Sequence, residues 1–182
     1  GKSTLVNALV GRKVAITSPR PQTTRNTIRG ILSTDEAQLV LVDTPGLHRP
    51  RTALGERLNR LVEGTLAEAD AVVFVLDATQ RIGPGDRLIA ERLRQAGTPT
   101  VLVVNKVDAA SRDAVGEQLA EAGEWGFHAY VPLSALQGEN LAPLVGELVA
   151  LLPEGPAYFP AGMVTDQPEE LLIGELIREK FL

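Results

Sequence analysis

Residues Thr100–Asp108 read TVLVVNKVD, a run of apolar and β-branched side chains that passes directly into a polar turn. Such a run is typical of a strand covered on both faces, as in a parallel sheet. Three other stretches are predicted strands: Gln38–Asp43, Ala71–Asp77 and His128–Leu133. Between them, apolar residues recur at spacings of three and four, as on one face of a helix. The alternation predicts an α/β fold with a mostly parallel sheet and helices on both faces.

Composition places the chain among ordinary globular proteins. Of its 182 residues, 44% are hydrophobic and 23% are charged. There is no cysteine, which excludes disulfides and thiolate metal sites and fits a reducing compartment. The sequence has no apolar run long enough to span a bilayer, so we expect a cytoplasmic protein.

The charges are unevenly distributed. Residues 1–34 contain no aspartate or glutamate, although the whole chain holds 23 acidic residues. A basic beginning suggests an anionic partner such as phosphate or nucleic acid, and a solvated loop explains it equally well. The basic residues in this region are Lys2, Arg12, Lys13, Arg20, Arg25 and Arg29.

The chain opens on Gly1-Lys2-Ser3-Thr4, followed by an amphipathic helical pattern. This is the end of the phosphate-binding loop G-x-x-x-x-G-K-[ST], in which the lysine reaches the terminal phosphates and the hydroxyl binds Mg²⁺. Backbone N–H groups at the helix N-terminus add to the attraction for an anion. All four residues are therefore predicted to bind a nucleotide. Alone, the pattern also fits a helix start with a chance lysine.

A second polar group, Asp43-Thr44-Pro45-Gly46, follows a predicted strand. An acid at a strand's carboxyl end sits where ligands bind in open α/β sheets. Asp43 is predicted to hold Mg²⁺, usually through water, because that ion prefers oxygen ligands and keeps its waters. Gly46 has no side chain to block a γ-phosphate from its backbone N–H. An ordinary strand-to-turn connection explains the same residues equally well.

The third group, Asn105-Lys106-Val107-Asp108, points to a base. A carboxylate only accepts hydrogen bonds, and guanine presents two donors side by side where adenine presents an acceptor. Asp108 is therefore predicted to select guanine, because adenine would leave a buried charge unpaired. Asn105 is expected to tie this turn to the phosphate loop, and the Lys106 stem is expected to cover the base. The alternative is a polar turn after a strand.

The fourth group, Ser134-Ala135-Leu136, is expected to lend a backbone N–H to the guanine oxygen. Alone it is uninformative. All four groups occur in the required order, each at the end of a strand or the start of a helix. Specificity multiplies when the contexts of several motifs agree, so the set predicts a guanine-nucleotide site.

The four groups together resemble those of the translation-factor-like GTPases. Within them, the first-switch stretch Ile16–Arg25 (ITSPRPQTTR), the run Val42–His48 (VDTPGLH) and Phe159-Pro160 resemble the Era-type GTPases, as does Glu175–Lys180. The resemblance spans essentially the whole chain. It implies a P-loop NTPase fold of the Ras-like G-domain type at 1–152, a linker at 153–167 and the beginning of an RNA-binding KH domain at 168–182. The family's first strand, the first half of its phosphate loop and most of its KH domain would then lie outside the chain.

The resemblance also implies the reaction, in which water attacks the γ-phosphate of GTP in line and GDP is left. Lys2, Thr24 and Gly46 would act on the phosphate, although residue chemistry alone leaves Thr23 equal to Thr24. Leu47 stands where Ras-like enzymes place a water-orienting glutamine, so slow intrinsic hydrolysis is expected. The residues leave open whether a monovalent cation or the ribosome assists. The implied Mg²⁺ ligands are Ser3, Thr24 and Asp43.

The implied partners are 16S ribosomal RNA and the 30S subunit, in whose assembly the Era family acts. A cytoplasmic monomer is expected, and peripheral association with the inner face of the membrane stays open. Two other functions also stay open. One is a nucleotide-sensing module with negligible turnover, and the other is a related GTPase that acts in tRNA modification or carries two G domains.

Helix-breaking residues predict a linker followed by a helix in the C-terminal region. Proline and glycine are frequent in Pro153–Pro160, which favours a linker. Asp166 is expected to cap a following helix that has Pro168 in its first turn. Such a helix would have nothing of its own to pack on, so it is expected to begin a second domain.

Overall fold

The computed structural model describes residues 1–17, 27–45 and 64–181. The chain forms two compact units, each of which is described by itself. The sheet unit comprises Gly1 and Leu66–Pro153, and the hairpin unit comprises Lys2–Thr65 and Glu154–Leu182. Within the described ranges, no helix is both long enough and apolar enough to cross a membrane.

Three parallel strands form the centre of the sheet unit, in the order β3 (Val72–Asp77), β4 (Thr100–Asn105) and β5 (Ala129–Leu133). Every residue of β4 is buried, as its apolar sequence predicts for a central strand. The predicted bounds are correct for β4, and β3 and β5 each begin one residue later than predicted. The prediction of parallel strands with surrounding helices is confirmed.

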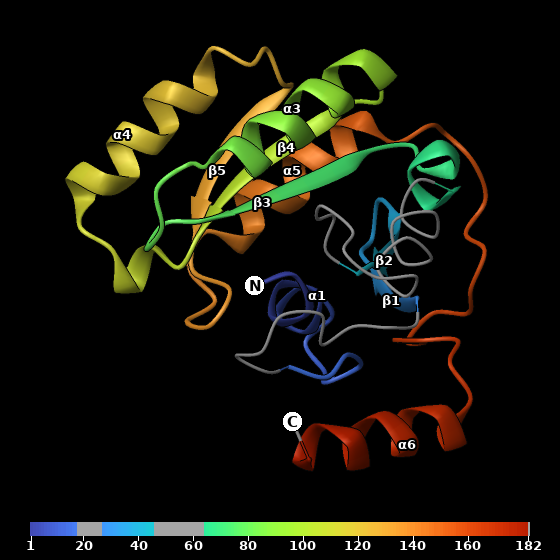
Figure 1. Ribbon diagram of the computed structural model, residues 1–182. Coiled ribbons are helices and arrows are strands. Elements are labelled where there is room, and N and C mark those ends of the chain that lie inside the picture. Colours follow the sequence, from blue (N-terminus) through green and yellow to red (C-terminus); the bar gives the residue numbers. More distant parts are fainter. Residues whose placement is uncertain (18–26, 46–63, 182) are drawn as a thin grey trace. The chain divides into compact units, whose positions relative to one another are not determined.

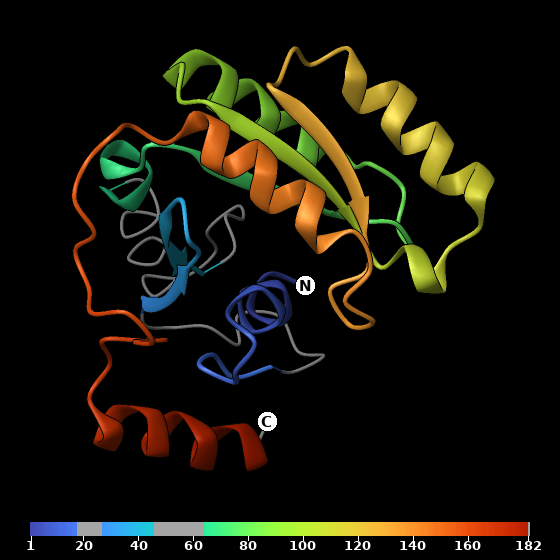
Figure 2. The ribbon, with the colours of Figure 1, turned by 180° about the vertical axis from the view of Figure 1, so that it is seen from behind.

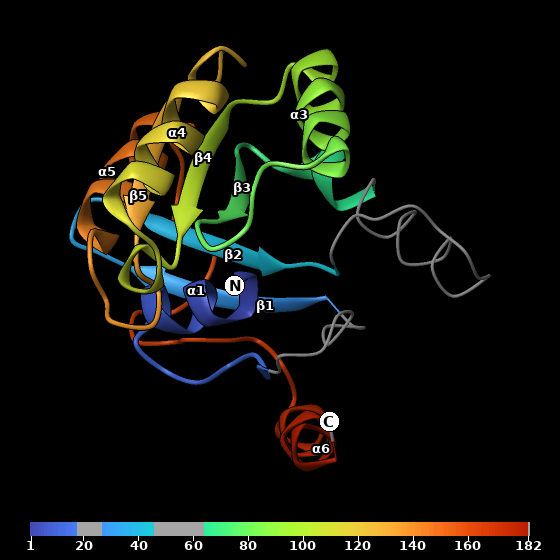
Figure 3. The ribbon, with the colours of Figure 1, turned by 60° about the vertical axis from the view of Figure 1, so that its left-hand side comes forward.

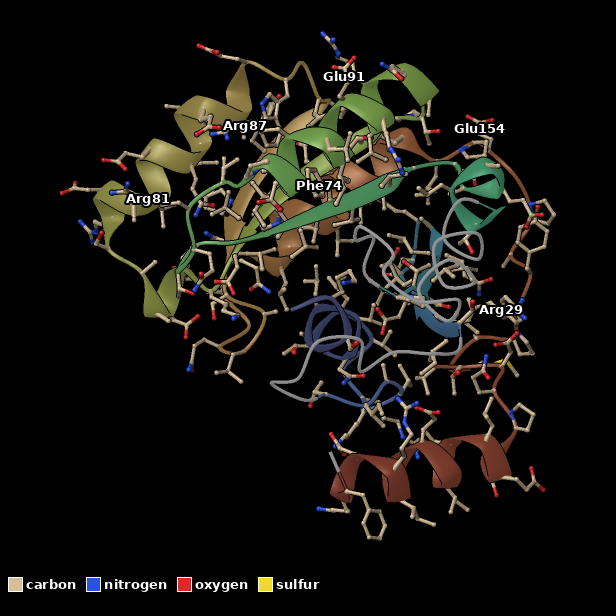
Figure 4. All side chains as sticks on the ribbon, in the orientation of Figure 1. Arg29, Phe74, Arg81, Arg87, Glu91 and Glu154 are labelled. Atoms are coloured by element: carbon tan, nitrogen blue, oxygen red, sulfur yellow. The ribbon has the colours of Figure 1, made fainter. Side chains whose placement is uncertain are left out.

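Helices α3 (Pro84–Ala96) and α5 (Leu141–Leu151) cover opposite faces of this sheet, as the front and rear views show (Figures 1 and 2). Helix α4 (Arg112–Gly123) contacts β4 and β5. Leu102 and Val104 of β4 belong to one buried core with residues of α3 and α4. At its margin Phe74, labelled in Figure 4, stacks against Trp125 with ring centres 6.1 Å apart.

The hairpin unit contains an antiparallel pair, β1 (Ile28–Ser33) and β2 (Gln38–Asp43), and helix α1 (Lys2–Val10) packs on both strands (Figure 3). The prediction of β2 is correct to the residue. Strand β1 was not predicted, because Arg29 and Gly30 interrupt its short apolar run. Ile28 and Ile31 of this strand are nevertheless buried, and Gly30 lies against Val6 and Val10 of α1.

Gly30 lets α1 approach β1 closely, which gives a stability prediction. A Cβ at position 30 would lie 2.8 Å from a γ-carbon of Val10 and 2.9 Å from one of Val6. Valine is stiff at χ1, so neither neighbour can turn aside cheaply. We expect Gly30→Ala to lower the free energy of unfolding by about 1–3 kcal/mol, as overpacking does. Denaturant unfolding of the full-length protein measures this change.

The matched control for Gly30→Ala is Gly116→Ala on α4, where a Cβ meets no atom within 4 Å. Alanine favours a helix interior over glycine by about 0.5–1 kcal/mol, so this control should stabilise the protein slightly. Equal effects of the two substitutions would show that close packing at Gly30 is unimportant.

The predicted linker is hydrogen-bonded to the β1–β2 hairpin within the hairpin unit. Ile31 donates its backbone N–H to the Val164 carbonyl over 2.8 Å, and the Thr165 hydroxyl donates to the Arg29 carbonyl over 2.7 Å. Farther along, the Gln38 side chain donates to the Phe159 carbonyl over 2.9 Å. Residues 158–165 are therefore anchored along the hairpin, an arrangement that proline and glycine content alone did not indicate.

Helix α6 (Glu169–Lys180) confirms the predicted helix but corrects its cap. The residue at the N-cap is Pro168, and no side chain caps the helix. Asp166 instead forms an ion pair with Arg29, with 3.1 Å between Oδ2 and the guanidinium Nε (Arg29 is labelled in Figure 4). A paired carboxylate is held away from the helix N-terminus, so Asp166 does not serve as a cap.

Helix α6 is also not without a partner, contrary to expectation. Glu179 accepts hydrogen bonds from the Lys13 ammonium over 2.5 Å and from the Thr17 backbone N–H over 3.0 Å. Lys13 and Arg29 are thus paired with acids from the C-terminal segment and do not form a free basic patch. The basic start of the chain and its later acids meet within the hairpin unit, which explains part of the charge asymmetry.

The contact of Glu179 is expected to weaken in acid. The Lys13 hydrogen bond and charge, with bonds from Thr17, hold the pKa of Glu179 below its ordinary value despite partial burial. A lowered pKa in the folded state means that the stabilisation is present above the ordinary pKa and is lost as the pH falls through the lowered one. Amide exchange of Thr17, followed by NMR, should therefore show protection near neutral pH that declines below about pH 4.

Glu179→Gln should lower the same protection of Thr17 at neutral pH and remove its acid dependence. Glu169→Gln, in the first turn of the same helix, is the control and should change neither. Unaltered Thr17 exchange in Glu179→Gln would contradict the role given to this carboxylate.

Candidate functional site

The phosphate-loop serine and the aspartate that ends β2 lie side by side in the hairpin unit. Ser3, in the first turn of α1, donates its hydroxyl hydrogen to Asp43 Oδ2 over 2.6 Å. Asp43 is only 2% exposed, so its carboxyl group is kept inside the unit next to a hydroxyl. A buried charge is costly unless it is paired, hydrogen-bonded or bound to a cation. The fold therefore brings together two residues 40 positions apart that were predicted to share a metal.

These two side chains suit Mg²⁺. Both offer oxygen, and Mg²⁺ in nucleotide sites takes one or two protein ligands while phosphates and water complete its octahedron. Across the residues that the structure describes, no group of three or more histidine, cysteine, aspartate or glutamate side chains is placed to hold a metal. The donor set accordingly fits an ion that arrives with a phosphate ligand.

The N-terminus of α1 is suited to an anion. The helix begins at Lys2, and its first turn contains no acidic residue. The first backbone N–H groups of a helix have no partner within the helix, and the helix dipole adds partial positive charge there. Lys2 is exposed and Thr4 is half-buried in this turn. The predicted phosphate contacts from residues 2–4 are thus placed on one helix end.

Asn105 ends β4 in the sheet unit and is 2% exposed. Its Oδ1 accepts two backbone hydrogen bonds, from Lys106 over 2.7 Å and from Ala135 over 3.0 Å. These bonds fix the amide plane and direct Nδ2 away from both donors. Nδ2 lies 3.9 Å from the position that a Cβ would take on Gly1, which belongs to the same unit. This arrangement supports the predicted tie between Asn105 and the phosphate loop.

Asp108 lies in the short 3₁₀ turn η1 (Val107–Ala109) and is held from one side. Its Oδ1 accepts a hydrogen bond from the hydroxyl of Ser134 over 2.5 Å. In the part of the chain that the structure describes, its Oδ2 has no hydrogen-bond partner. Asp108 is exposed, so the predicted penalty for an unpaired charge arises only when a base covers the carboxylate.

Ser134 has a role that the sequence did not reveal. Its side chain is fully buried and orients Asp108, while its backbone forms a bridge with Glu139. The Ala135 N–H is already donated to Asn105, so of these three residues only Leu136 has a backbone N–H without a bond in the described structure. Leu136 is also 72% exposed. The contact of this loop with the guanine oxygen stays a prediction, and Leu136 is the residue of the three whose N–H is not donated within the described structure.

Lys106 and Asp77 form a pair that sequence reasoning missed. Lys106 Nζ lies 2.5 Å from Asp77 Oδ2, at the ends of the neighbouring strands β4 and β3. Burial raises the pKa of Asp77, but hydrogen bonds from Lys106 and Thr79 outweigh it, so the net pKa lies below the ordinary value. An aspartate at a strand end is common, and only the register that sets Asp77 opposite Asn105 would have pointed to this pair.

Several predicted site residues lie outside the described residues. They are Thr23, Thr24, Gly46 and Leu47, so the switch ligand and the γ-phosphate contact remain sequence predictions. The described site residues form two groups, Ser3 with Asp43 and Asn105 with Asp108 and Ser134–Leu136. Each group is assembled by its own unit.

Comparison with known proteins places these groups in context. A family described as "50S ribosome-binding GTPase" matches residues 1–106. Curated relatives named GTPase Era match the whole chain, with 47% identity in Alkaliphilus metalliredigens and 54% in Mycobacterium tuberculosis strain H37Rv. In both cases the chain spans 62% of the relative's length.

Two solved structures of Era cover 99% of the chain at 38% identity, and the chain covers 62% of each. One is Era in complex with MgGDPNP and nucleotides 1506–1542 of 16S ribosomal RNA, with a TM-score of 0.93. The other is an Aquifex aeolicus Era variant bound to GDP and AlF4⁻, with a TM-score of 0.92.

Proposed function

The chain belongs to the family of 50S ribosome-binding GTPases and is of the Era type, and on that premise we propose that it binds GTP with Mg²⁺ and hydrolyses the GTP to GDP and phosphate. The observation that carries the proposal is the pre-set turn at the end of β4. There Asn105 and Asp108 are each oriented by a hydrogen bond from the 134–135 loop of the protein itself.

Base selection follows from the oriented carboxylate. Oδ1 of Asp108 is held by Ser134, and the carboxylate as a whole faces solvent, where it can accept from the ring N1–H and the exocyclic amine of guanine. Adenine offers an acceptor at the matching ring position and would leave the covered carboxylate without a donor. The Leu136 N–H is the donor that we assign to the guanine oxygen.

The phosphate end follows from Ser3 and Asp43. These residues would hold Mg²⁺, which supplies charge neutralisation on the phosphates during transfer. Lys2 adds a second positive charge at the helix end, and positioning together with electrostatic stabilisation provides most of the catalysis in this class of reaction. Thr24 as a further ligand and Gly46 as a γ-phosphate donor are carried over from the family resemblance alone.

We further propose that the GTP-bound protein acts on 16S ribosomal RNA in assembly of the 30S subunit. Support comes from the Era structure in complex with 16S ribosomal RNA, to which the chain is 38% identical. This role requires a cytoplasmic protein, and a monomer suffices for it. Membrane association and dependence on a monovalent cation remain secondary proposals.

Single-turnover release of phosphate from GTP tests the enzymatic proposal. The full-length protein, loaded with GTP and Mg²⁺, should release phosphate slowly alone and faster with purified 30S subunits. Sedimentation of the protein with a non-hydrolysable GTP analogue should show binding to 30S subunits rather than to 50S subunits. GTP binding without any release would favour the nucleotide-sensing module, and binding only to 50S subunits would contradict the proposed partner.

A further inference from the structure

Both ends of the Lys106 side chain are held in place. Its backbone has a left-handed conformation, with φ of 71°, which is unusual for a residue other than glycine. The Lys106 backbone N–H donates to Asn105 Oδ1 over 2.7 Å, and Nζ reaches Asp77 Oδ2 over 2.5 Å. Contacts within the protein therefore stretch the apolar stem between the ends of β4 and β3.

Asp77 is itself rigidly placed. It is the last residue of β3 and lies opposite Asn105 in the parallel register. Its Oδ1 accepts hydrogen bonds from the Thr79 backbone over 3.0 Å and from the Thr79 hydroxyl over 2.6 Å. Its carbonyl accepts from the buried side chain of Gln118 over 3.1 Å. One carboxylate oxygen thus serves the local turn, and the other is directed at Lys106.

Resting on the nucleotide site proposed above, we infer that Asp77 is a positioning residue for guanine nucleotides. By fixing the Lys106 ammonium, Asp77 holds the lysine stem as a preformed cover for one face of the base. A lysine side chain loses much rotamer freedom when it is ordered, and a cover ordered in advance spares the ligand that cost. In the described structure Lys106 is the one cation within ion-pair distance of Asp77.

The consequence is kinetic, because interactions that hold a bound ligand chiefly set its rate of release. Asp77→Asn keeps an oxygen that can accept from Thr79 but removes the charge that anchors Lys106. The pair is partly exposed, so its contribution is modest. We expect a fluorescent GDP analogue to dissociate roughly two to five times faster from this variant of the full-length protein in stopped-flow measurements.

Thr79→Val is the matched control for loosening of the turn. It removes one hydrogen bond to Asp77 and leaves the charge pair with Lys106 intact, so it should change the dissociation rate less than Asp77→Asn does. The preference for guanine over xanthine should be unchanged in both variants, because that choice belongs to Asp108. Equal acceleration in the two variants would show that only the integrity of the turn matters.

A double-mutant cycle separates positioning from a merely structural role. Lys106→Met keeps an apolar stem and removes the ammonium, so Asp77→Asn should add less than about a twofold change in this background. Additive effects would overturn the inference. Melting temperatures identify any variant that does not fold. If Asp77→Asn does not fold, the Lys106→Met variant alone tests the inference. A dissociation rate of the GDP analogue equal to that of the wild type would then refute the anchoring role.

The cycle also separates this inference from the function on which it rests. If the wild-type protein does not bind the GDP analogue, the proposed nucleotide site itself fails. If the wild type binds the analogue and Asp77→Asn releases it at the same rate, the site stands and only the role of Asp77 is lost.

Discussion

Replacing Asp108 with asparagine should weaken GTP binding by roughly two to four orders of magnitude, because two hydrogen bonds to a charged acceptor are lost. The amide presents a donor or an acceptor toward the base but cannot accept from two guanine donors as the carboxylate does. Xanthine has a carbonyl oxygen where guanine has its amine, so the same variant should bind xanthosine triphosphate more tightly than the wild type does.

Calorimetric titration of the full-length protein with both nucleotides measures this exchange of specificity. Asp113→Asn is the matched control, because it makes the same chemical change at an exposed position in the first turn of α4. The control should bind GTP as the wild type does. Unchanged GTP affinity in Asp108→Asn would remove this carboxylate from the base site.

Replacing Ser3 with alanine should lower the single-turnover rate of GTP hydrolysis at least about a hundredfold, since loss of one preorganised group at a developing charge commonly costs that much. The wild-type hydroxyl lies 2.6 Å from Asp43 Oδ2, so alanine removes an oxygen from the pair that we assign to Mg²⁺. The variant should also need a higher Mg²⁺ concentration to reach half of its maximal rate.

The matched control for Ser3→Ala is Ser33→Ala at the end of β1, where the hydroxyl accepts a hydrogen bond from Gln38 at the surface. This control should keep both the rate and the Mg²⁺ dependence of the wild type. A Ser3→Ala protein with a normal rate and a normal Mg²⁺ requirement would show that Ser3 is not a ligand of the ion.

The sequence was most informative where burial is strongest. Strand β4 was predicted to the residue because its apolar run has no polar interruption, and β2 was predicted because its short apolar run is bounded by Gln38 and Asp43. Strand β1 was missed because burial against α1 comes from tertiary packing, which permits a glycine and an arginine within a short strand. The local pattern of hydrophobic residues indicates such a strand only weakly.

The sequence motifs predict candidate site residues because each motif places residue types of one chemistry at one position in the chain, and their contacts with a nucleotide stay predictions. The roles of Asp77 and the Ser134 hydroxyl were not predictable, because each acts on a residue 26 or more positions away through strand register and loop closure. The N–H of Leu136 was singled out only after Ala135 was seen to serve Asn105. Contacts of this kind depend on strand register and loop geometry, which the spacing of residues along the sequence does not specify.

The ion pairs of the C-terminal segment were also not predictable from the sequence. The sequence records basic residues before position 34 and acids after it, but it does not say which of them meet. Two ion pairs, Lys13 with Glu179 and Arg29 with Asp166, join the basic N-terminal part of the hairpin unit to its acidic C-terminal part. They also explain why Asp166, a good helix cap by sequence, does not cap α6.

The turn at the end of β4 is expected to select guanine. Calorimetric titration of the full-length protein with GTP and with ATP, both in the presence of Mg²⁺, measures this selectivity. We predict binding of GTP at least about a hundredfold tighter than binding of ATP, as expected when a bound base covers the Asp108 carboxylate without offering it donors. Equal affinities for the two nucleotides, or no binding of either, would contradict this expectation.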